Sequence, residues 1–187
     1  MEALSESQKF SVIMIDPPWP QRKGNVRKVR PNQARELDYR TMPVNLIFQL
    51  LDRDIFSVAE TQHTIFIWAV DKFLRQCEQE MDLRGYKLHA RIIWDKGNGV
   101  APAFTVRFSH EYLLWYYIPG SFMPIAKEVR GKYTTVIHEK SREHSRKPVA
   151  AYEMISAFYP ETEKLDVFSR ESYKGWHQYG DEIDKFD

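Results

Sequence analysis

Short apolar runs with the length of a β-strand alternate along this chain with segments of helical periodicity. We expect strands at Ser11–Ile15, Thr64–Val70, Ala90–Trp94, Glu111–Ile118, Tyr133–Ile137 and Lys164–Ser169. Helices are predicted between them, at Val44–Phe56, from Phe73 to a stop at Gly85, and from Pro148 to a stop at Pro160. Strands that alternate with helices favour an α/β fold in which helices cover both faces of one sheet.

The composition narrows the class of protein further. The chain has 187 residues, which predicts one domain spanning residues 1–187. A single cysteine, Cys77, excludes an internal disulfide and any metal site built from several cysteines. The six histidines show no ligand spacing, so we expect no metal. The apolar runs are far shorter than a bilayer span and the first residues do not resemble a signal peptide, which predicts a cytoplasmic protein with no membrane partner.

The formal net charge of +1 conceals two basic segments. Residues 21–35 hold six basic side chains and no acidic one, and residues 127–147 hold seven basic against three acidic ones. Such segments can neutralise the phosphates of a nucleic acid, although a charged run can also be a solvated loop. Residues 20–43 and 96–109 lack periodicity and follow strands, where open α/β sheets build their sites. We therefore expect both to be substrate loops, with nucleic-acid contacts from Arg22, Lys23, Arg27, Lys28 and Arg30.

The sequence Asp16-Pro17-Pro18-Trp19 follows directly after a predicted buried strand. Each proline lacks an N–H group and fixes its own φ, so the chain must leave the strand in a rigid, extended form. The Asp16 carboxylate and the Pro17 carbonyl then offer two acceptors beside the flat ring of Trp19, which suits a planar base with an exocyclic amino group. A Pro-rich turn, with Asp16 capping a backbone N–H and Trp19 in the core, explains the same residues.

Further motifs follow along the chain: Tyr39 to Met42, Ile65 to Trp68, Ile92 to Trp94, His110 to Leu114, Glu143 to Pro148, Lys164 to Arg170, and Gly175-Trp176 with Gly180 to Glu182. In this order, over residues 12–182, they resemble the MT-A70 family of adenine methyltransferases. The resemblance implies an α/β, Rossmann-like methyltransferase fold in permuted order, with the catalytic motif before the cofactor motif. The implied methyl donor is S-adenosylmethionine, which leaves as S-adenosylhomocysteine. Asp16, Pro17, Pro18 and Trp19 would be catalytic, with Asp16 and Pro17 holding the adenine amino group and Trp19 stacking on the base.

The same resemblance implies the cofactor contacts. Lys147 would face the methionine carboxylate with Ser145 nearby, and the ribose would be surrounded by Asp166, Arg170, Asp181 and Glu182. Plainer explanations exist for each of these residues. Lys147 can be a solvated lysine at a helix start, Asp166 a carboxylate at a strand end, and Arg170 and Glu182 a surface ion pair. A cation at a helix start opposes the helix dipole, so a bound carboxylate accounts better for Lys147. Many relatives have Asn at the position of Asp181.

Three residues are candidates for substrate contacts by the same resemblance. His110 and Glu111 would border the active site, although a pair at a strand start can also simply satisfy backbone groups. Tyr39 lies in the first substrate loop and would cover the base if Trp19 were a structural plate beside the pocket.

Together these observations predict an enzyme that transfers a methyl group from S-adenosylmethionine to the 6-amino group of adenine in nucleic acid. DNA is the preferred substrate in this prediction and RNA the second choice. The main alternative is a catalytically inactive nucleic-acid-binding subunit of a methyltransferase complex, against which the intact Asp16–Trp19 motif argues. A small-molecule methyltransferase is disfavoured by the basic loop. The sequence leaves a homodimer and a heterodimer both open.

Overall fold

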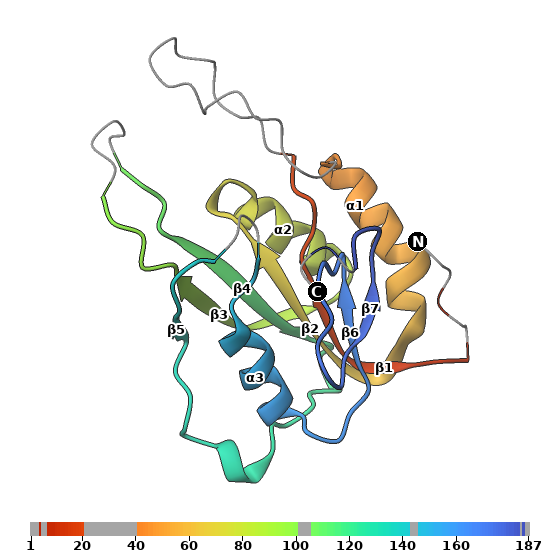
Figure 1. Cartoon of the computed structure of the whole chain (residues 1–187). Helices are drawn as coiled ribbons and strands as arrows, with labels where there is room; N and C mark the ends of the chain where they lie inside the picture. The colour runs from red at the N-terminus through yellow and green to blue at the C-terminus, as the bar shows by residue number, and fades with distance from the viewer. Residues whose placement is uncertain are drawn as a thin grey trace.

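A seven-stranded sheet lies at the centre of the computed structural model, which describes residues 4, 7–20, 41–100, 106–142, 146–183 and 185 (Figure 1). The strands are β1 (Phe10–Ile15), β2 (Ala59–Ala69), β3 (Lys87–Asp95), β4 (His110–Tyr117), β5 (Val136–His138), β6 (Lys164–Val167) and β7 (His177–Tyr179). Their order is β5-β3-β4-β2-β1-β6-β7. All neighbouring pairs are parallel except β3–β4 and β2–β4, so β4 alone runs against the other six.

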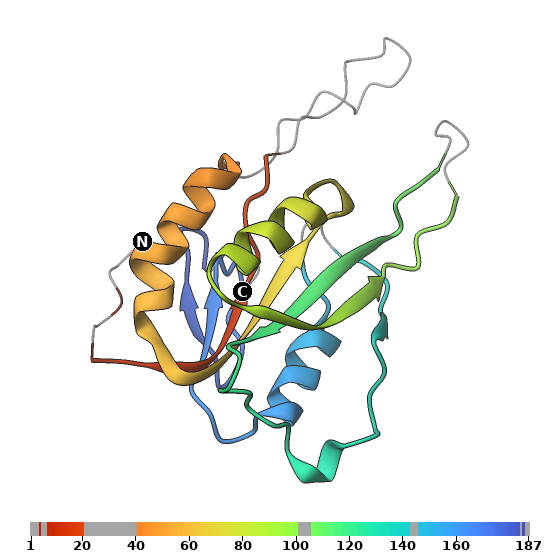
Figure 2. The ribbon, with the colours of Figure 1, turned by 180° about the vertical axis from the view of Figure 1, so that it is seen from behind.

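Helices cover both faces of this sheet. The helices α1 (Val44–Leu50) and α2 (Asp71–Leu83) lie on one face and α3 (Val149–Phe158) lies on the other, as Figures 1 and 2 show from opposite sides. Ile13 and Ile15 of β1 pack in the α1–α2 layer, whereas Val12 and Met14 pack in the α3 layer. Successive residues of a strand point to opposite faces, so a strand buried on both faces is apolar throughout. The predicted α/β class is confirmed, and the sheet is consistent with a methyltransferase fold.

Most predicted elements are present with shifted ends. The helix expected over residues 44–56 stops being α-helical at Leu50 and continues as a π-helical segment (Leu51–Ile55) and a 3-10 turn (Phe56–Val58). The strand expected at residues 133–137 lies at 136–138, because Tyr133 packs against Phe158 instead of joining the sheet. Strand β7 was not predicted, since three residues are too few to show a periodicity; it is defined by its parallel pairing with β6.

The sheet places several chain segments at one edge. The parallel strands β1, β2 and β6 end there, and antiparallel β4 begins there, with Glu111 opposite Trp94 and Tyr112 opposite Ala69. Beyond this edge, residues 96–100 and 106–109 continue from β3 and β4 as two adjacent segments (Figure 1). The Lys96 N–H donates to the Ser109 carbonyl at 2.9 Å and joins the two. None of the helices in the described ranges is long and apolar enough to cross a membrane.

Candidate active site

A cleft of about 690 Å³ opens at this edge of the sheet. Its walls are formed by residues 16–19 after β1, residues 41–46 at the start of α1, residues 68–70 at the end of β2, and residues 168–170 with 181–182 after β6 and β7. Glu111 and Lys147 complete the lining. The structure therefore brings together the Asp16–Trp19 motif with four of the residues expected to bind a cofactor, namely Lys147, Arg170, Asp181 and Glu182.

Backbone hydrogen bonds hold the motif in place after β1. The Trp19 N–H donates to the Pro17 carbonyl at 2.8 Å, and the Met42 N–H donates to the Pro18 carbonyl at 2.9 Å. The two prolines thus leave a short, rigid segment that is tied to the chain just before α1. A carbonyl oxygen has two lone pairs, so Pro17 can still accept a second hydrogen bond from a substrate.

Trp19 is held from several sides. Its ring is 3% exposed and stacks on Phe73 with centroids 5.4 Å apart and planes at 13°. Its Nε1–H donates to the carbonyl of Trp68 at 2.9 Å. These contacts match the structural plate that was the alternative to base stacking, and they leave the indole almost no surface for a base. Stacking of a base on Trp19 stays a prediction.

Four charged side chains of the cleft lining and Lys96 form a row of alternating charges, which we call the charged row: Lys96, Glu111, Lys147, Asp16 and Arg170. Lys96 donates to one carboxylate oxygen of Glu111, and Lys147 Nζ lies 3.0 Å from the other. Lys147 Nζ also lies 2.9 Å from Asp16 Oδ1, and Arg170 Nη2 lies 3.8 Å from Asp16 Oδ2. Lys147 is therefore buried between two carboxylates rather than solvated.

The charges in this row stabilise one another. Burial by itself would raise the pKa of Glu111, but Lys147 and Lys96 outweigh it and lower that pKa to about 2. Burial would likewise lower the pKa of Lys147, but Asp16 and Glu111 raise it above its ordinary value. Both groups are consequently ionised at neutral pH, which keeps a cation beside Asp16.

The start of α3 has a carboxylate that the sequence did not reveal. The backbone N–H groups of Val149 and Ala150 donate to the two carboxylate oxygens of Glu139 at 3.0 and 2.9 Å. An anion there compensates the helix dipole. The unfavourable position of Lys147 at the helix start is thus already explained by protein carboxylates, so the dipole argument for a bound carboxylate does not hold.

Asp166 lies on the α3 face of the sheet and does not line the cleft. It is 2% exposed and accepts a hydrogen bond from the Tyr152 hydroxyl at 2.8 Å. It borders a separate cavity of about 20 Å³, which Asp16, Lys147 and Arg170 also line. Burial raises the pKa of Asp166 to about 7, despite the hydrogen bond from Tyr152. The Asp166 side chain is buried outside the lining of the cleft, and the ribose contact predicted for it stays a prediction.

Two neighbouring segments, residues 168–170 and 180–182, supply the wall on the β6 side. Phe168 has a φ of 62°, which is rare for a bulky residue, and its N–H donates to the Tyr179 carbonyl at 2.6 Å. A Cβ at Gly180 would lie only 2.7 Å from the Ser169 carbonyl oxygen. A glycine at position 180 therefore lets the two segments approach closely enough to present Arg170, Asp181 and Glu182 to the same cleft.

The remaining candidates separate into two groups. His110 opens β4 opposite Asp95 and packs against Tyr112, and it does not line the cleft. Glu111 lines the cleft, with one oxygen accepting from each of its two lysines. Outside the described residues lie Tyr39, Ser145, Arg22, Lys23, Arg27, Lys28 and Arg30.

Several apolar residues of the cleft were not predicted. Trp68 lies in the buried end of β2 and Val70 follows that strand, Phe168 follows β6, and Met42 and Leu46 lie where the chain enters α1. The rule that sites form beyond the carboxyl ends of parallel strands points to the first three. Among the described residues, no group of three His, Cys, Asp or Glu side chains is placed to hold a metal ion.

Comparisons with known proteins identify the family and several relatives of the chain. The sequence model of the family MT-A70 matches residues 10–182. A probable N(6)-adenosine-methyltransferase MT-A70-like of Oryza sativa subsp. japonica is 30% identical over 184 residues, covering 94% of this chain and 23% of that protein. An N(6)-adenosine-methyltransferase MT-A70-like of Arabidopsis thaliana is also 30% identical, over 93% of this chain and 24% of its own length. The type II methyltransferase M.MunI of Mycoplasma sp is 22% identical over 94% of this chain and 78% of its own length. The chain thus spans about a quarter of the length of these plant relatives.

Proposed function

The chain belongs to the MT-A70 family of methyltransferases, and from this premise we propose that it transfers a methyl group from S-adenosylmethionine to the 6-amino group of adenine in a nucleic acid. The observation that carries the proposal is that one cleft holds the acceptors Asp16 and Pro17 together with Lys147, Asp181 and Glu182. In this proposal the catalytic motif precedes the cofactor-binding residues along the chain.

The cleft suits the methyl donor in size and in chemistry. Its volume of about 690 Å³ falls in the range of about 300–1,000 Å³ found for small-molecule sites. Two of the three N–H groups of the Lys147 ammonium serve Asp16 and Glu111, and the third can donate to a ligand carboxylate. Asp181 and Glu182 offer acceptors to sugar hydroxyls. Met42 and Leu46 offer apolar surface to a ring. When bound, S-adenosylmethionine would supply a methyl group on a sulfonium sulfur. The adenine nitrogen would take this methyl group as the carbon–sulfur bond breaks, and would release one N–H proton to solvent.

The residues of the motif would act on the amino nitrogen, whose lone pair is delocalised into the adenine ring. The Asp16 carboxylate and the second lone pair of the Pro17 carbonyl accept the two N–H groups and turn the nitrogen lone pair out of the ring plane. Both acceptors also stabilise the positive charge that develops on the nitrogen, so they bind the transition state more tightly than the ground state. Lys147 and Arg170 keep the Asp16 carboxylate in position for this contact.

Membership of the family supports a nucleic-acid substrate, and we propose DNA in preference to RNA. An adenine within a duplex is out of reach of such a cleft, so a duplex would need its base flipped out at a cost of a few kcal/mol. The alternative of a catalytically inactive subunit is not favoured, because the acceptors Asp16 and Pro17 and the cation Lys147 all line the cleft.

Transfer of labelled methyl groups to matched DNA and RNA oligonucleotides, single- and double-stranded, tests the proposal. We expect labelled 6-methyladenine in one polymer, and a loss of roughly 10²-fold or more in kcat for Asp16→Ala, the size found when one transition-state contact is removed. Binding of S-adenosylmethionine, measured by calorimetry, should persist in this variant. Asp82→Ala, an exposed aspartate on α2, is the matched control and should behave as wild type. Turnover retained by Asp16→Ala would overturn the assignment.

A further inference from the structure

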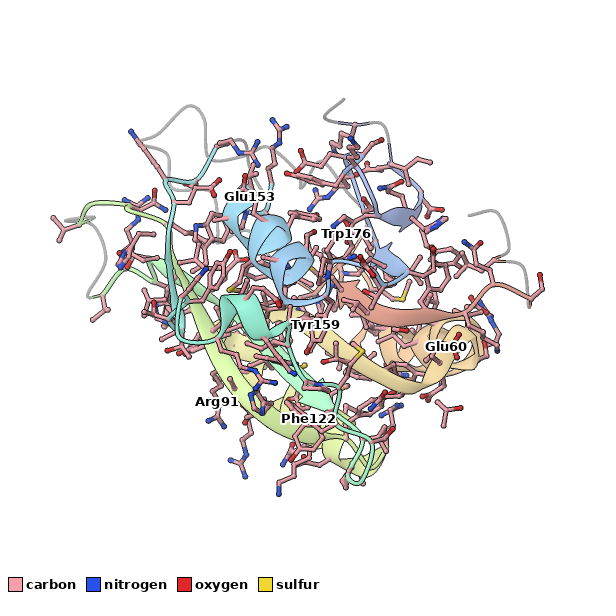
Figure 3. The ribbon with its side chains drawn as sticks, turned by 90° about the horizontal axis from the view of Figure 1, so that it is seen from below. Glu60, Arg91, Phe122, Glu153, Tyr159 and Trp176 are labelled. Carbon is pink, nitrogen blue, oxygen red and sulfur yellow. The ribbon has the colours of Figure 1, made fainter. Side chains whose placement is uncertain are left out.

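A second groove of about 440 Å³ lies on the α3 side of the sheet and shares no lining residue with the cleft. Its walls come from β3 and β4, from the last turn of α3, and from residues 122–135, the segment between β4 and β5. Figure 3 views the molecule from below, with Phe122 on this segment and Tyr159 just after α3. The Tyr159 hydroxyl donates to the Met123 carbonyl at 3.2 Å and ties the segment to the end of that helix.

Aromatic rings line this groove in unbroken contact, and we call them the aromatic row: Phe122, His89, Trp115, Phe158 and Tyr133. Successive ring centroids are 5.1, 4.3, 5.5 and 5.2 Å apart. The two end members are exposed to solvent, Phe122 by 38% and Tyr133 by 44%. Partial burial lowers the pKa of His89, which favours the neutral form of the ring in this row. The row therefore ends in two flat rings that other planar groups can reach.

Three cations lie on the same segment as the exposed rings. Lys127, Arg130 and Lys132 are exposed, and none of them forms an ion pair with any residue that the structure describes. Glu128 is the one acidic residue between positions 122 and 138. Exposed rings beside an excess of positive charge match a ligand that has planar bases and a phosphate backbone.

Other ligands match only part of this surface. An apolar peptide would cover the rings but would leave three cations without counter-charges. A lone phosphate would engage the cations and leave Phe122 and Tyr133 uncovered. A single-stranded nucleic acid satisfies both sets of groups, because every base has a face that stacks on an aromatic ring.

We propose that the aromatic row and the cations Lys127, Arg130 and Lys132 form a second nucleic-acid contact, in which an unpaired base stacks on Tyr133 or Phe122. The inference rests on the proposed function in that it assumes a nucleic-acid substrate. Helix α3 begins beside the cleft and ends at the groove, and its ten residues span about 15 Å at 1.5 Å each. A 12-residue oligonucleotide, with about 3.4 Å per nucleotide even when stacked, spans both sites.

Binding of a fluorescent single-stranded 12-residue oligonucleotide, followed by anisotropy over a range of salt concentrations, tests the proposal. For Arg130→Ser/Lys132→Ser we expect weaker binding and a slope of log K against log salt that is smaller by about 1.4, from about 0.7 for each phosphate contact. For Tyr133→Ala we expect about 5- to 150-fold weaker binding, the loss of one stacked base. Arg75→Ser/Lys174→Ser removes two exposed cations elsewhere and is the matched control, with the wild-type slope expected.

Three measurements make the outcomes distinct. Binding of S-adenosylmethionine should match wild type in every variant, since none of these residues lines the cleft. Thermal unfolding checks that each variant is folded at the temperature of the binding assay, because Tyr133→Ala also removes the packing against Phe158. An equal loss of oligonucleotide binding in the control variant would show general electrostatic attraction and would overturn the proposal. Wild-type binding by both groove variants would also overturn it, and would leave the groove to a protein partner. If the oligonucleotide binds as expected but is never methylated, the proposed function fails and the second contact stands. If it is methylated and the groove variants bind it normally, the second contact fails and the proposed function stands.

Discussion

Removing the Glu111 carboxylate should lower the free energy of unfolding by about 3 kcal/mol. Deleting one partner of a buried ion pair costs about 3–5 kcal/mol, because the charge that is left has lost both water and counter-ion. Glu111→Ala removes the single carboxylate that Lys96 and Lys147 share as a counter-ion. We expect a loss at the lower end of this range, because Lys147 retains Asp16 as a counter-ion and the Lys96 side chain is 20% exposed to solvent. For a chain of this size, 1 kcal/mol corresponds to roughly 2–4 °C, so the unfolding temperature should fall by about 6–12 °C.

Glu78→Ala is the matched control for this prediction. Glu78 Oε1 lies 2.6 Å from Arg91 Nε, but the Glu78 side chain is 23% exposed and that of Arg91 is 50% exposed. Exposed ion pairs contribute about 0–1 kcal/mol to stability. Urea unfolding followed by circular dichroism at pH 7 compares the two variants with wild type. Equal losses would show that burial does not set the cost of breaking these pairs, and would refute the reasoning.

The pH dependence of the same comparison provides a second check. Since the pKa of Glu111 falls from 4.5 to about 2 on folding, its contribution to stability is fully present above pH 4.5 and is lost as the pH falls toward 2. The difference between wild type and Glu111→Ala should therefore shrink over that range. A difference that stays constant down to pH 2 would mean that the carboxylate is not stabilised by the lysines.

Two further predictions concern the neighbourhood of the cleft. Gly180→Ala places a Cβ about 2.7 Å from the Ser169 carbonyl oxygen, so we expect the free energy of unfolding to fall by about 1–3 kcal/mol. Binding of S-adenosylmethionine, measured by calorimetry, should also be weaker. Wild-type values for both quantities would contradict the close approach of the two segments. Asp166 has a pKa of about 7 in the fold against an ordinary 3.8, so the folded state binds more protons and its stability falls as the pH rises from about 4 to 7. Asp166→Asn can still accept from Tyr152 and should remove this component of the slope, as measured by urea unfolding from pH 4 to 8; an unchanged slope would contradict the assignment.

Much of the fold follows from patterns that are local in the sequence. The apolar run before Asp16 predicts a strand buried on both faces, and the two prolines after it predict a rigid exit from the sheet; both are present. Gly85 ends the second helical segment at a φ of 80°, a conformation that glycine adopts without strain. The helix after Lys147 was predicted one residue early, because Pro148 precedes the helix instead of starting it. Periodicity, proline and glycine act over a few residues, so a single sequence contains the information.

The structure brings part of the predicted site together, and the roles of its residues stay predictions. The motif residues and Lys147 line one cleft, and the resemblance had assigned them to one site. The resemblance did not indicate that Trp19 would be packed against Phe73, or that Asp166 would face Tyr152 in the α3 layer. The face to which a strand residue points depends on the register of the whole sheet, and one residue of shift reverses it.

By itself, the sequence determined the strand–helix alternation, the rigid acceptor motif after the first strand and the family of the chain. Only the tertiary structure decided which charges meet. Lys147 lies between Asp16 and Glu111 because β4 runs antiparallel and begins at the edge where β1 ends. The aromatic row has the same origin, since it joins rings from β3, β4, α3 and the segment before β5. Such contacts join residues far apart in the chain, and their energies depend on the strand order and burial that arise only when the sheet has formed.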